Sequence, residues 1–79
     1  MSEHTVSKVL DLKGLPCPMP VVKISQEIGS VAVGEVIEVH TTDPGSLSDF
    51  PAWAKTTGNE VLESEQGEGV IKIFVKRLK

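Results

Sequence analysis

The stretch LDLKGLPCPMPVVK, residues 10–23, contains the change from a strand to a helix on which the fold depends. Val6–Asp11 has the length of a short strand, although its apolar alternation is imperfect. From Pro18 to about Ile28 the apolar residues recur on one face of a helix. GLPCPMP, residues 14–20, joins the two elements and contains the only cysteine of the chain. A strand that passes directly into a helix favours an α/β fold.

Further strands are predicted in the middle of the chain and near its end. Glu35–Thr41 alternates apolar and polar side chains, as a half-buried strand does. Glu60–Gln66 and Val70–Arg77 read as two strands joined by Gly67-Glu68-Gly69, which is a hairpin signal. The last two strands should therefore be antiparallel.

The second helix follows the sequence TDPGS and contains a proline. Pro51 would delete a hydrogen bond if the helix were already under way. We therefore expect a tight first turn at Pro44–Ser48 and a helix capped near Ser48 or Asp49. Gly58 should end the helix. The expected apolar stripe comprises Phe50, Trp53 and Ala54.

The element order β-α-β-α-β-β predicts a two-layer α/β sandwich. Short β-α-β units favour parallel neighbours, and the closing hairpin adds an antiparallel strand. Two helices are too few to cover both faces of four strands, so both should lie on one face of a mixed sheet. The alternation of Ile71, Ile73 and Val75 with Lys72, Phe74 and Lys76 suits one buried and one mostly wet face. We expect a single domain over residues 1–79, with its core at about 6–77.

Composition restricts the class of partner and the compartment. The net charge is −3 and the pI is near 5.2, whereas nucleic-acid binders usually carry a basic excess. We therefore expect no direct nucleic-acid binding. No signal peptide or membrane-spanning apolar run is visible, so no membrane association is expected. A single unpaired thiol suits a reducing compartment, which favours a cytoplasmic location.

Cys17 is predicted to lie at the start of the first helix. It should be the N-cap, with Pro18 at N1 and Pro20 at N3, which leaves mainly the amides of Met19 and Val21 to face the sulfur. Helix N-termini lower the pKa of a thiol. Lys13 and Lys23 are close enough in sequence to add positive charge. A moderately activated, surface-exposed thiolate is therefore expected.

A lone thiol can also serve other roles. The bland interpretation is a buried packing residue, which is the commoner fate of a lone cysteine. No second cysteine is present for a dithiol cycle. One cysteine and two histidines, one of them His4, supply a metal site poorly, so no metal is expected. A hydrolase would need His40 as its base, but His40 alternates in phase with Glu38 and should face solvent.

The sequence resembles the TusA/SirA/YedF family of small sulfur-carrier proteins from about Leu10 to Val75. The resemblance rests on LDLKGLPCPMPVVK with its CPxP motif, on Gly34, and on TTDPGSLSDFPAWAKTTGNEVL. It implies the same two-layer sandwich and a Cys17 that carries sulfane sulfur as a persulfide. It favours a carrier, at most a sulfurtransferase, over a stand-alone enzyme.

The resemblance also implies partners and supporting residues. The sulfur donor would be a cysteine desulfurase or a rhodanese-like enzyme, and the acceptor another cysteine protein. The destinations found in the family include tRNA thiolation, cofactor sulfuration and sulfur oxidation, and some members handle selenium. No cofactor is implied. The expected supporting residues around Cys17 are Lys13, Pro18, Met19, Pro20, Lys23 and Asp43.

Two alternative functions also fit the sequence. The chain could be a non-catalytic interaction or regulatory module with Cys17 as packing, in which case alkylation should be slow, with a midpoint at or above the ordinary thiol pKa. It could also be a hydrolase that depends on His40. The pathway, the donor and the acceptor depend on surface contacts with partner proteins.

Overall fold

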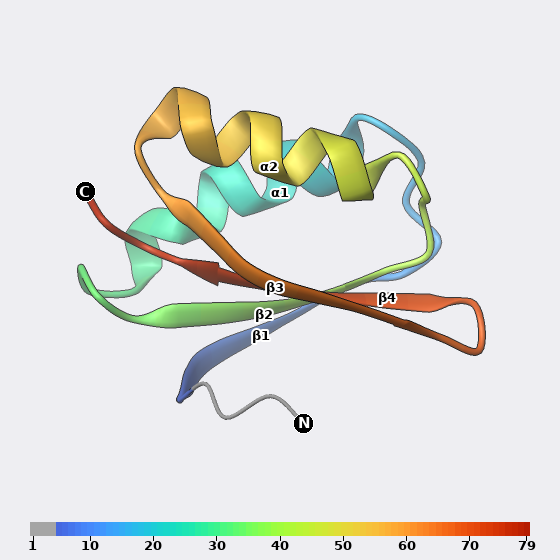
Figure 1. Ribbon diagram of the computed structural model, residues 1–79, viewed down its shortest axis with the longest axis horizontal. Helices are drawn as coiled ribbons and strands as arrows, with labels where there is room; N and C mark the ends of the chain where they lie inside the picture. The colour runs from blue at the N-terminus through green and yellow to red at the C-terminus, as the bar shows by residue number, and fades with distance from the viewer. Residues whose placement is uncertain (1–4) are drawn as a thin grey trace.

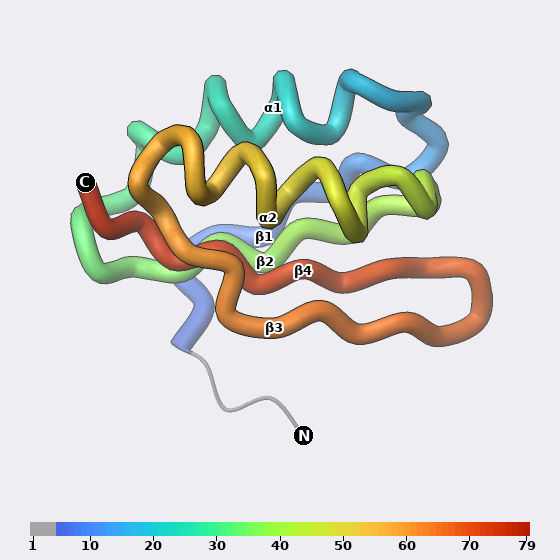
Figure 2. Tube along the Cα trace, turned by 45° about the horizontal axis from the view of Figure 1, so that its top comes forward, coloured from blue at the N-terminus to red at the C-terminus, as the bar shows by residue number. Residues whose placement is uncertain are grey.

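The computed structural model describes residues 5–79, and its elements follow the predicted order β-α-β-α-β-β. Both helices lie side by side on the same face of the sheet, as Figures 1 and 2 show. The predicted two-layer sandwich is confirmed. The elements are β1 (Val6–Leu12), α1 (Met19–Glu27), the 3₁₀ turn η1 (Ile28–Ser30), β2 (Val36–Thr41), α2 (Ser46–Thr57), β3 (Glu60–Gly67) and β4 (Val70–Lys76).

The four strands form one mixed sheet in the order β1-β2-β4-β3. β1 and β2 are parallel, whereas β4 is antiparallel to both β2 and β3. The carboxyl ends of β1 and β2 therefore lie at the same edge of the sheet, where Leu12 pairs with Thr41. Each of these ends leads into a helix, so the loops before α1 and α2 are neighbours.

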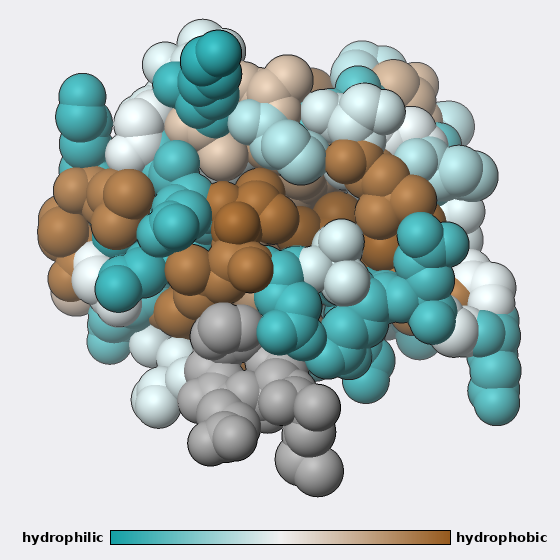
Figure 3. Space-filling model, viewed as in Figure 1, coloured by the Kyte–Doolittle hydropathy of each residue, from teal (hydrophilic) through white to brown (hydrophobic). Residues whose placement is uncertain are grey.

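The core lies between the sheet and the helices. β2 contributes Ile37 and Val39, and α1 contributes Ile24, each with 0% of its surface exposed. α2 contributes Phe50, Trp53 and Ala54, which is the expected apolar stripe. On the side viewed in Figure 3, hydrophobic side chains gather across the middle of the molecule, between the helical layer and the sheet.

The sheet face opposite the helices is less exposed to solvent than the alternation in β4 predicted. Phe74, on the same face as Lys72, is only 4% exposed, and Glu38 and His40 are half-buried. Phe74 pairs across the sheet with Glu38 on β2 and with Glu63 on β3. A simple apolar and polar alternation therefore described only the helix-facing side correctly.

Both helices begin at positions other than those predicted. The N-cap of α1 is Pro18, so Cys17 lies one residue before the cap and Pro20 is the second residue of the helix. α2 begins at Ser46, with Gly45 as its N-cap, and it includes Pro51. The expected tight first turn is present, because the N–H groups of Ser46, Leu47 and Ser48 donate to carbonyls three residues back. The predicted cap at Ser48 or Asp49 is wrong, because this turn continues directly into the helix.

The end of α2 agrees with the sequence. Gly58 has a φ of 78°, a left-handed conformation that favours glycine, and its N–H donates to the Ala54 carbonyl. The β3–β4 hairpin turns at Glu68-Gly69, with Gly67 paired to Val70. Among the described residues, no helix is long and apolar enough to cross a membrane.

Candidate functional site

Cys17 is an exposed, free thiol in the loop between β1 and α1. The Met19 N–H donates to the Pro16 carbonyl at 2.8 Å, which closes a four-residue turn over Pro16–Met19. The Cys17–Pro18 peptide within this turn is cis. The surface presentation predicted from the flanking prolines is therefore present, and Cys17 is not among the core residues.

The loop that carries Cys17 is joined to the loop before α2. The Gly14 N–H donates to the Thr42 hydroxyl oxygen at 2.9 Å, and Gly14 has a φ of 84° that suits glycine. The parallel pairing of β1 and β2 places the two loops together. As a result, the Cys17 Sγ–H donates a hydrogen bond to Asp49 Oδ2 at 3.2 Å, across 32 positions of sequence.

A second carboxylate, that of Asp43, lies beside the same thiol. Its Oδ1 accepts from the Gly45 N–H at 3.2 Å, and its own N–H donates to Thr41 Oγ1 at 3.1 Å. Its Oδ2 is buried and has no hydrogen-bond partner within residues 5–79. A β-carbon added at Gly45 would lie 3.3 Å from Asp43 Oδ2 and 3.6 Å from Asp49 Oδ2. Gly45 therefore leaves room for the two carboxylates at the start of α2.

These carboxylates raise the pKa of the Cys17 thiol above its ordinary value. The largest cause is the hydrogen bond to Asp49, followed by desolvation and by the negative charges of Asp49 and Asp43. The expected lowering of this pKa is wrong. The helix begins one residue later than expected, and the charges against the sulfur are negative. A high alkylation midpoint therefore no longer separates a carrier thiol from a packing thiol, whereas the exposure of Cys17 does.

Of the other predicted supporting residues, the prolines and Met19 lie next to the thiol, whereas the two lysines do not act on it. Pro18 is exposed beside Cys17, Met19 is half-buried, and Pro20 is fully buried beneath the start of α1. Lys13 lines a hollow on the other face of the sheet. Lys23 lies on α1, where its charge acts on Glu27.

A shallow groove between α1 and α2 adjoins the thiol, with a volume of about 400 Å³. Trp53 is only 8% exposed, and its indole Nε1 is buried without a hydrogen-bond partner among the described residues. Trp53 therefore belongs both to the core and to the wall of this groove. The lining residues are Cys17, Pro18, Val21, Asp49, Ala52, Trp53 and Thr56.

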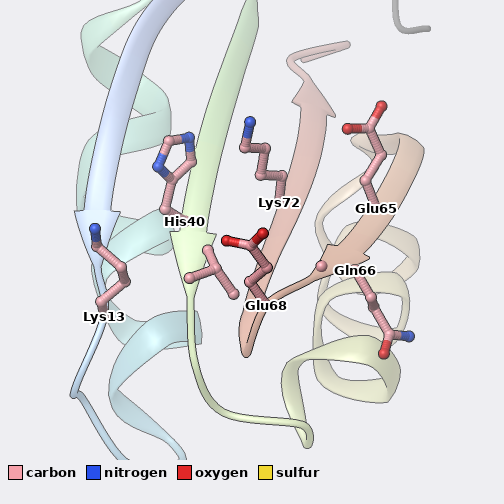
Figure 4. A pocket seen from close by; sticks show the side chains of 8 residues that line it. Lys13, His40, Glu65, Gln66, Glu68 and Lys72 are labelled. Atoms are coloured by element: carbon pink, nitrogen blue, oxygen red, sulfur yellow. The ribbon is translucent and has the colours of Figure 1, made fainter.

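His40 lies on the opposite face of the sheet from the helices and from this groove. Figure 4 shows it beside a second hollow of about 490 Å³, with Lys13, Lys72 and Glu68 around it and the helices behind the sheet. Its Nε2 pairs with Glu38 Oε2 at 2.5 Å. His40 lies on the predicted face of the sheet, away from the helices, although it is half-buried and not turned to solvent. From this position it cannot act as a base for Cys17.

One grouping of metal-ligand atoms involves Cys17. Its sulfur and one oxygen each of Asp43 and Asp49 lie within 4.8 Å of one another. Acidic groups often cluster without an ion, and these three donors combine a soft sulfur ligand with hard carboxylates, which different metals prefer. The grouping alone therefore does not indicate a metal site. His4 lies outside the described residues.

Asp49 is the site residue that the sequence argument missed, because it was interpreted as a helix cap. It lies instead in the first turn of α2, where its carboxylate meets the Cys17 thiol. A signal was present in the sequence. Parallel β1 and β2 must bring the loops that follow them to one edge of the sheet, and Asp49 follows the second of these loops.

Comparisons with known proteins find relatives that match nearly the whole chain. The chain is 43% identical over 79 residues to a protein of Halobacterium salinarum that is named, provisionally, a sulfur carrier; the match covers 99% of this chain and 98% of that one. It is 41% identical over 68 residues to the sulfur carrier protein TusA of Allochromatium vinosum, covering 86% of this chain and 90% of that one.

A solved structure and a family model match as well. The crystal structure of a SirA-like protein from Desulfitobacterium hafniense superposes with a TM-score of 0.77 at 23% identity, covering 91% of this chain and 99% of that one, which shows a shared fold. The family model of sulfurtransferase TusA matches residues 8–77. The chain therefore belongs to the TusA sulfurtransferase family.

Proposed function

We propose that the chain carries sulfane sulfur as a persulfide on Cys17 and passes it to a partner protein. The observation that supports this most is the exposure of the only thiol of the chain at the junction of two loops and an apolar groove. With no second cysteine in the sequence, a sulfur bound to Cys17 has no internal thiol to release it. Release then depends on another protein.

The transfer step is an exchange between two sulfur atoms. The Cys17 thiolate attacks the terminal sulfur of a donor persulfide, and the sulfur–sulfur bond of the donor breaks as a new one forms on Cys17. The inner sulfur of the donor leaves with the electron pair of the broken bond and takes up a proton, so the donor becomes a thiol again and no net oxidation occurs. An acceptor cysteine then attacks the terminal sulfur on Cys17 in the same way and restores the free thiol.

The surroundings of Cys17 supply positioning for this step. Buried Pro20 fixes the start of α1 against the core, and exposed Pro18 forms part of the groove wall. We assign Met19 and Lys23, both half-buried at the surface of α1, to contacts with partner proteins. Lys13 keeps a contact role at most, because it lines the hollow on the far side of the sheet.

The proposed partners are a donor of the cysteine desulfurase or rhodanese type and an acceptor with a reactive cysteine. Two relatives whose names include the words sulfur carrier protein support this role. We further propose that residues 1–79 act as one sulfur-carrying domain in the cytoplasm, where an unpaired thiol persists.

The two alternative functions fit the geometry less well. A packing role for Cys17 requires a buried side chain, but Cys17 is exposed. A hydrolase requires His40 near the thiol, but His40 lies across the sheet and pairs with Glu38.

The test is an intact-mass measurement after incubation with a cysteine desulfurase and free cysteine. The wild type should gain the mass of one sulfur atom, and a thiol reductant should remove it. Cys17→Ser should gain nothing, and His40→Ala should gain sulfur like the wild type. A wild type that stays unmodified with both a desulfurase and a rhodanese donor would defeat the proposal.

A further inference from the structure

The contact between Cys17 and Asp49 distinguishes the empty thiol from the loaded one. In the empty protein, the Sγ–H group donates to Asp49 Oδ2 at 3.2 Å. The contact needs a proton on sulfur, because a carboxylate only accepts hydrogen bonds. A thiolate or a sulfur bonded to a second sulfur has no such proton. Either change turns an attractive contact into one between electron-rich atoms.

The charges around the thiol all favour this neutral form. Asp49 on α2 and Asp43 in the loop before it both raise the pKa of Cys17. From the α1 side, the groove beside the thiol is lined by Pro18 and Val21, which do not titrate. Lys13 lines the hollow on the opposite face, and the charge of Lys23 acts on Glu27. The empty thiol therefore faces two carboxylates and no compensating cation from the elements packed against it within residues 5–79.

Asp43 holds its place independently of the thiol. Its Oδ1 accepts from the Gly45 N–H, and its backbone N–H donates to the buried Thr41 hydroxyl. Asp49 is the carboxylate whose oxygen touches the sulfur. Asp49 is therefore the main residue that favours the protonated sulfur, and Asp43 adds a second negative charge.

We infer that Asp49 holds the empty Cys17 as a neutral, hydrogen-bonded thiol and opposes its conversion to the persulfide. This inference rests on the proposed function for its second half. The empty carrier is thereby a slow nucleophile toward adventitious oxidants and alkylating agents. The loaded carrier loses the hydrogen bond and places an anionic persulfide beside Asp49 and Asp43. Loading is therefore less favourable than at an ordinary thiol, and the sulfur leaves more readily for an acceptor.

The effect of Asp49 on loading can be expressed as an exchange equilibrium with a small persulfide. Cys17 thiol and glutathione persulfide give Cys17 persulfide and glutathione, with one sulfur–sulfur bond broken and one formed. Asp49 stabilises only the thiol side of this exchange, through the Sγ–H contact. The substitution Asp49→Asn keeps the size of the side chain, removes the charge and adds an N–H donor that can face a persulfide anion.

The first experiment measures the pH dependence of the thiolate of the empty protein, by its ultraviolet absorbance and by the rate of iodoacetamide alkylation. Asp49→Asn should move the midpoint to lower pH. Below that midpoint alkylation should become faster, by less than the factor by which the thiolate fraction rises, because a thiolate of lower pKa is a weaker nucleophile. Asp49→Glu, which keeps the charge, should hold the midpoint above that of Asp49→Asn. Glu65→Gln on β3 removes the same charge elsewhere and should match the wild type. An Asp49→Asn midpoint at or above the wild-type value overturns the inference.

The second experiment measures the loaded fraction at equilibrium with glutathione persulfide and glutathione, by intact mass. Asp49→Asn should be loaded to a higher fraction than the wild type and Glu65→Gln. An equal or lower fraction overturns the claim that Asp49 opposes loading. A purely structural role for Asp49 would change the thermal unfolding midpoint without moving the thiolate midpoint. The thermal unfolding of Asp49→Asn and Glu65→Gln is therefore measured as well.

The two experiments separate this inference from the proposed function. If no variant ever takes up sulfur from any donor, the carrier function fails, while the thiolate midpoints still decide the protonation claim. If all variants load equally and share one midpoint, the carrier function stands and the role of Asp49 is refuted.

Discussion

Ile24 is the buried residue of α1, the helix that begins beside Cys17, that belongs to the main hydrophobic core. α1 spans nine residues, and of these only Pro20 and Ile24 are buried. Ile24 is 0% exposed and belongs to the main core, whereas Val22 on the same helix is 37% exposed. We predict that Ile24→Ala weakens the docking of α1 and that Val22→Ala does not.

The size of the effect follows from the burial. Replacing isoleucine by alanine loses about 0.8 kcal/mol of transfer free energy for each of the three carbons removed. The cavity left in a packed core brings the total to about 3–4 kcal/mol. A chain of 79 residues has a free energy of unfolding of about 4–12 kcal/mol. The substitution should therefore remove a large share of the stability.

The assay is urea unfolding, followed by the fluorescence of Trp53, the only tryptophan, and by far-ultraviolet circular dichroism. Val22→Ala should change the free energy of unfolding by no more than about 0.5 kcal/mol. A loss below about 1 kcal/mol for Ile24→Ala, or one no larger than that for Val22→Ala, would refute the account of how α1 is anchored.

Three further predictions concern the contacts that hold the frame of the site. The Lys8 ammonium lowers the pKa of Glu27, so this ion pair between β1 and α1 contributes stability above the ordinary glutamate pKa and loses it as pH falls through the lowered value. The difference in unfolding free energy between wild type and Lys8→Met, measured by urea unfolding at several pH values, should therefore shrink as the pH falls, and a difference independent of pH would contradict this. Gly58→Ala forces a residue with a side chain into a φ of 78° and should cost about 1–2 kcal/mol in urea unfolding, whereas Gly29→Ala, with open space and an ordinary φ, should not. Thr42→Val removes the acceptor of the Gly14 N–H and should cost about 1 kcal/mol, while amide exchange at Gly14 becomes faster; unchanged exchange would show that the bond does not join the two loops.

The fold was predictable because its local signals agree with one another. One element order is indicated by the apolar stripe of α2, by the glycine that ends this helix and by the hairpin at the end of the chain. Few sheet topologies are compatible with that order. Helix starts were less predictable. Pro51 suggested a late start for α2, but the chain tolerates a proline on the exposed side of the helix while Phe50 and Trp53 remain buried.

The position of the thiol was predictable, whereas its electrostatics were not. Three prolines and a strand-to-helix junction place Cys17 at the surface on sequence grounds alone. The sign of its pKa shift depends on Asp49, which is 32 positions away and reaches the sulfur only through the pairing of β1 with β2. The burial of Phe74 on the sheet face opposite the helices was missed for a related reason, because alternation within a strand says nothing about its neighbours.

The location of the added sulfur tests the central claim most directly. After loading by a desulfurase, the protein is digested with trypsin without reductant, which releases Gly14–Lys23 as the peptide containing Cys17. The account predicts one extra sulfur atom on this peptide, bonded to Cys17 in the fragment spectrum and lost on reduction. A loaded protein with the sulfur on any other peptide, or a Cys17 peptide that stays unmodified while the donor turns over, would contradict it.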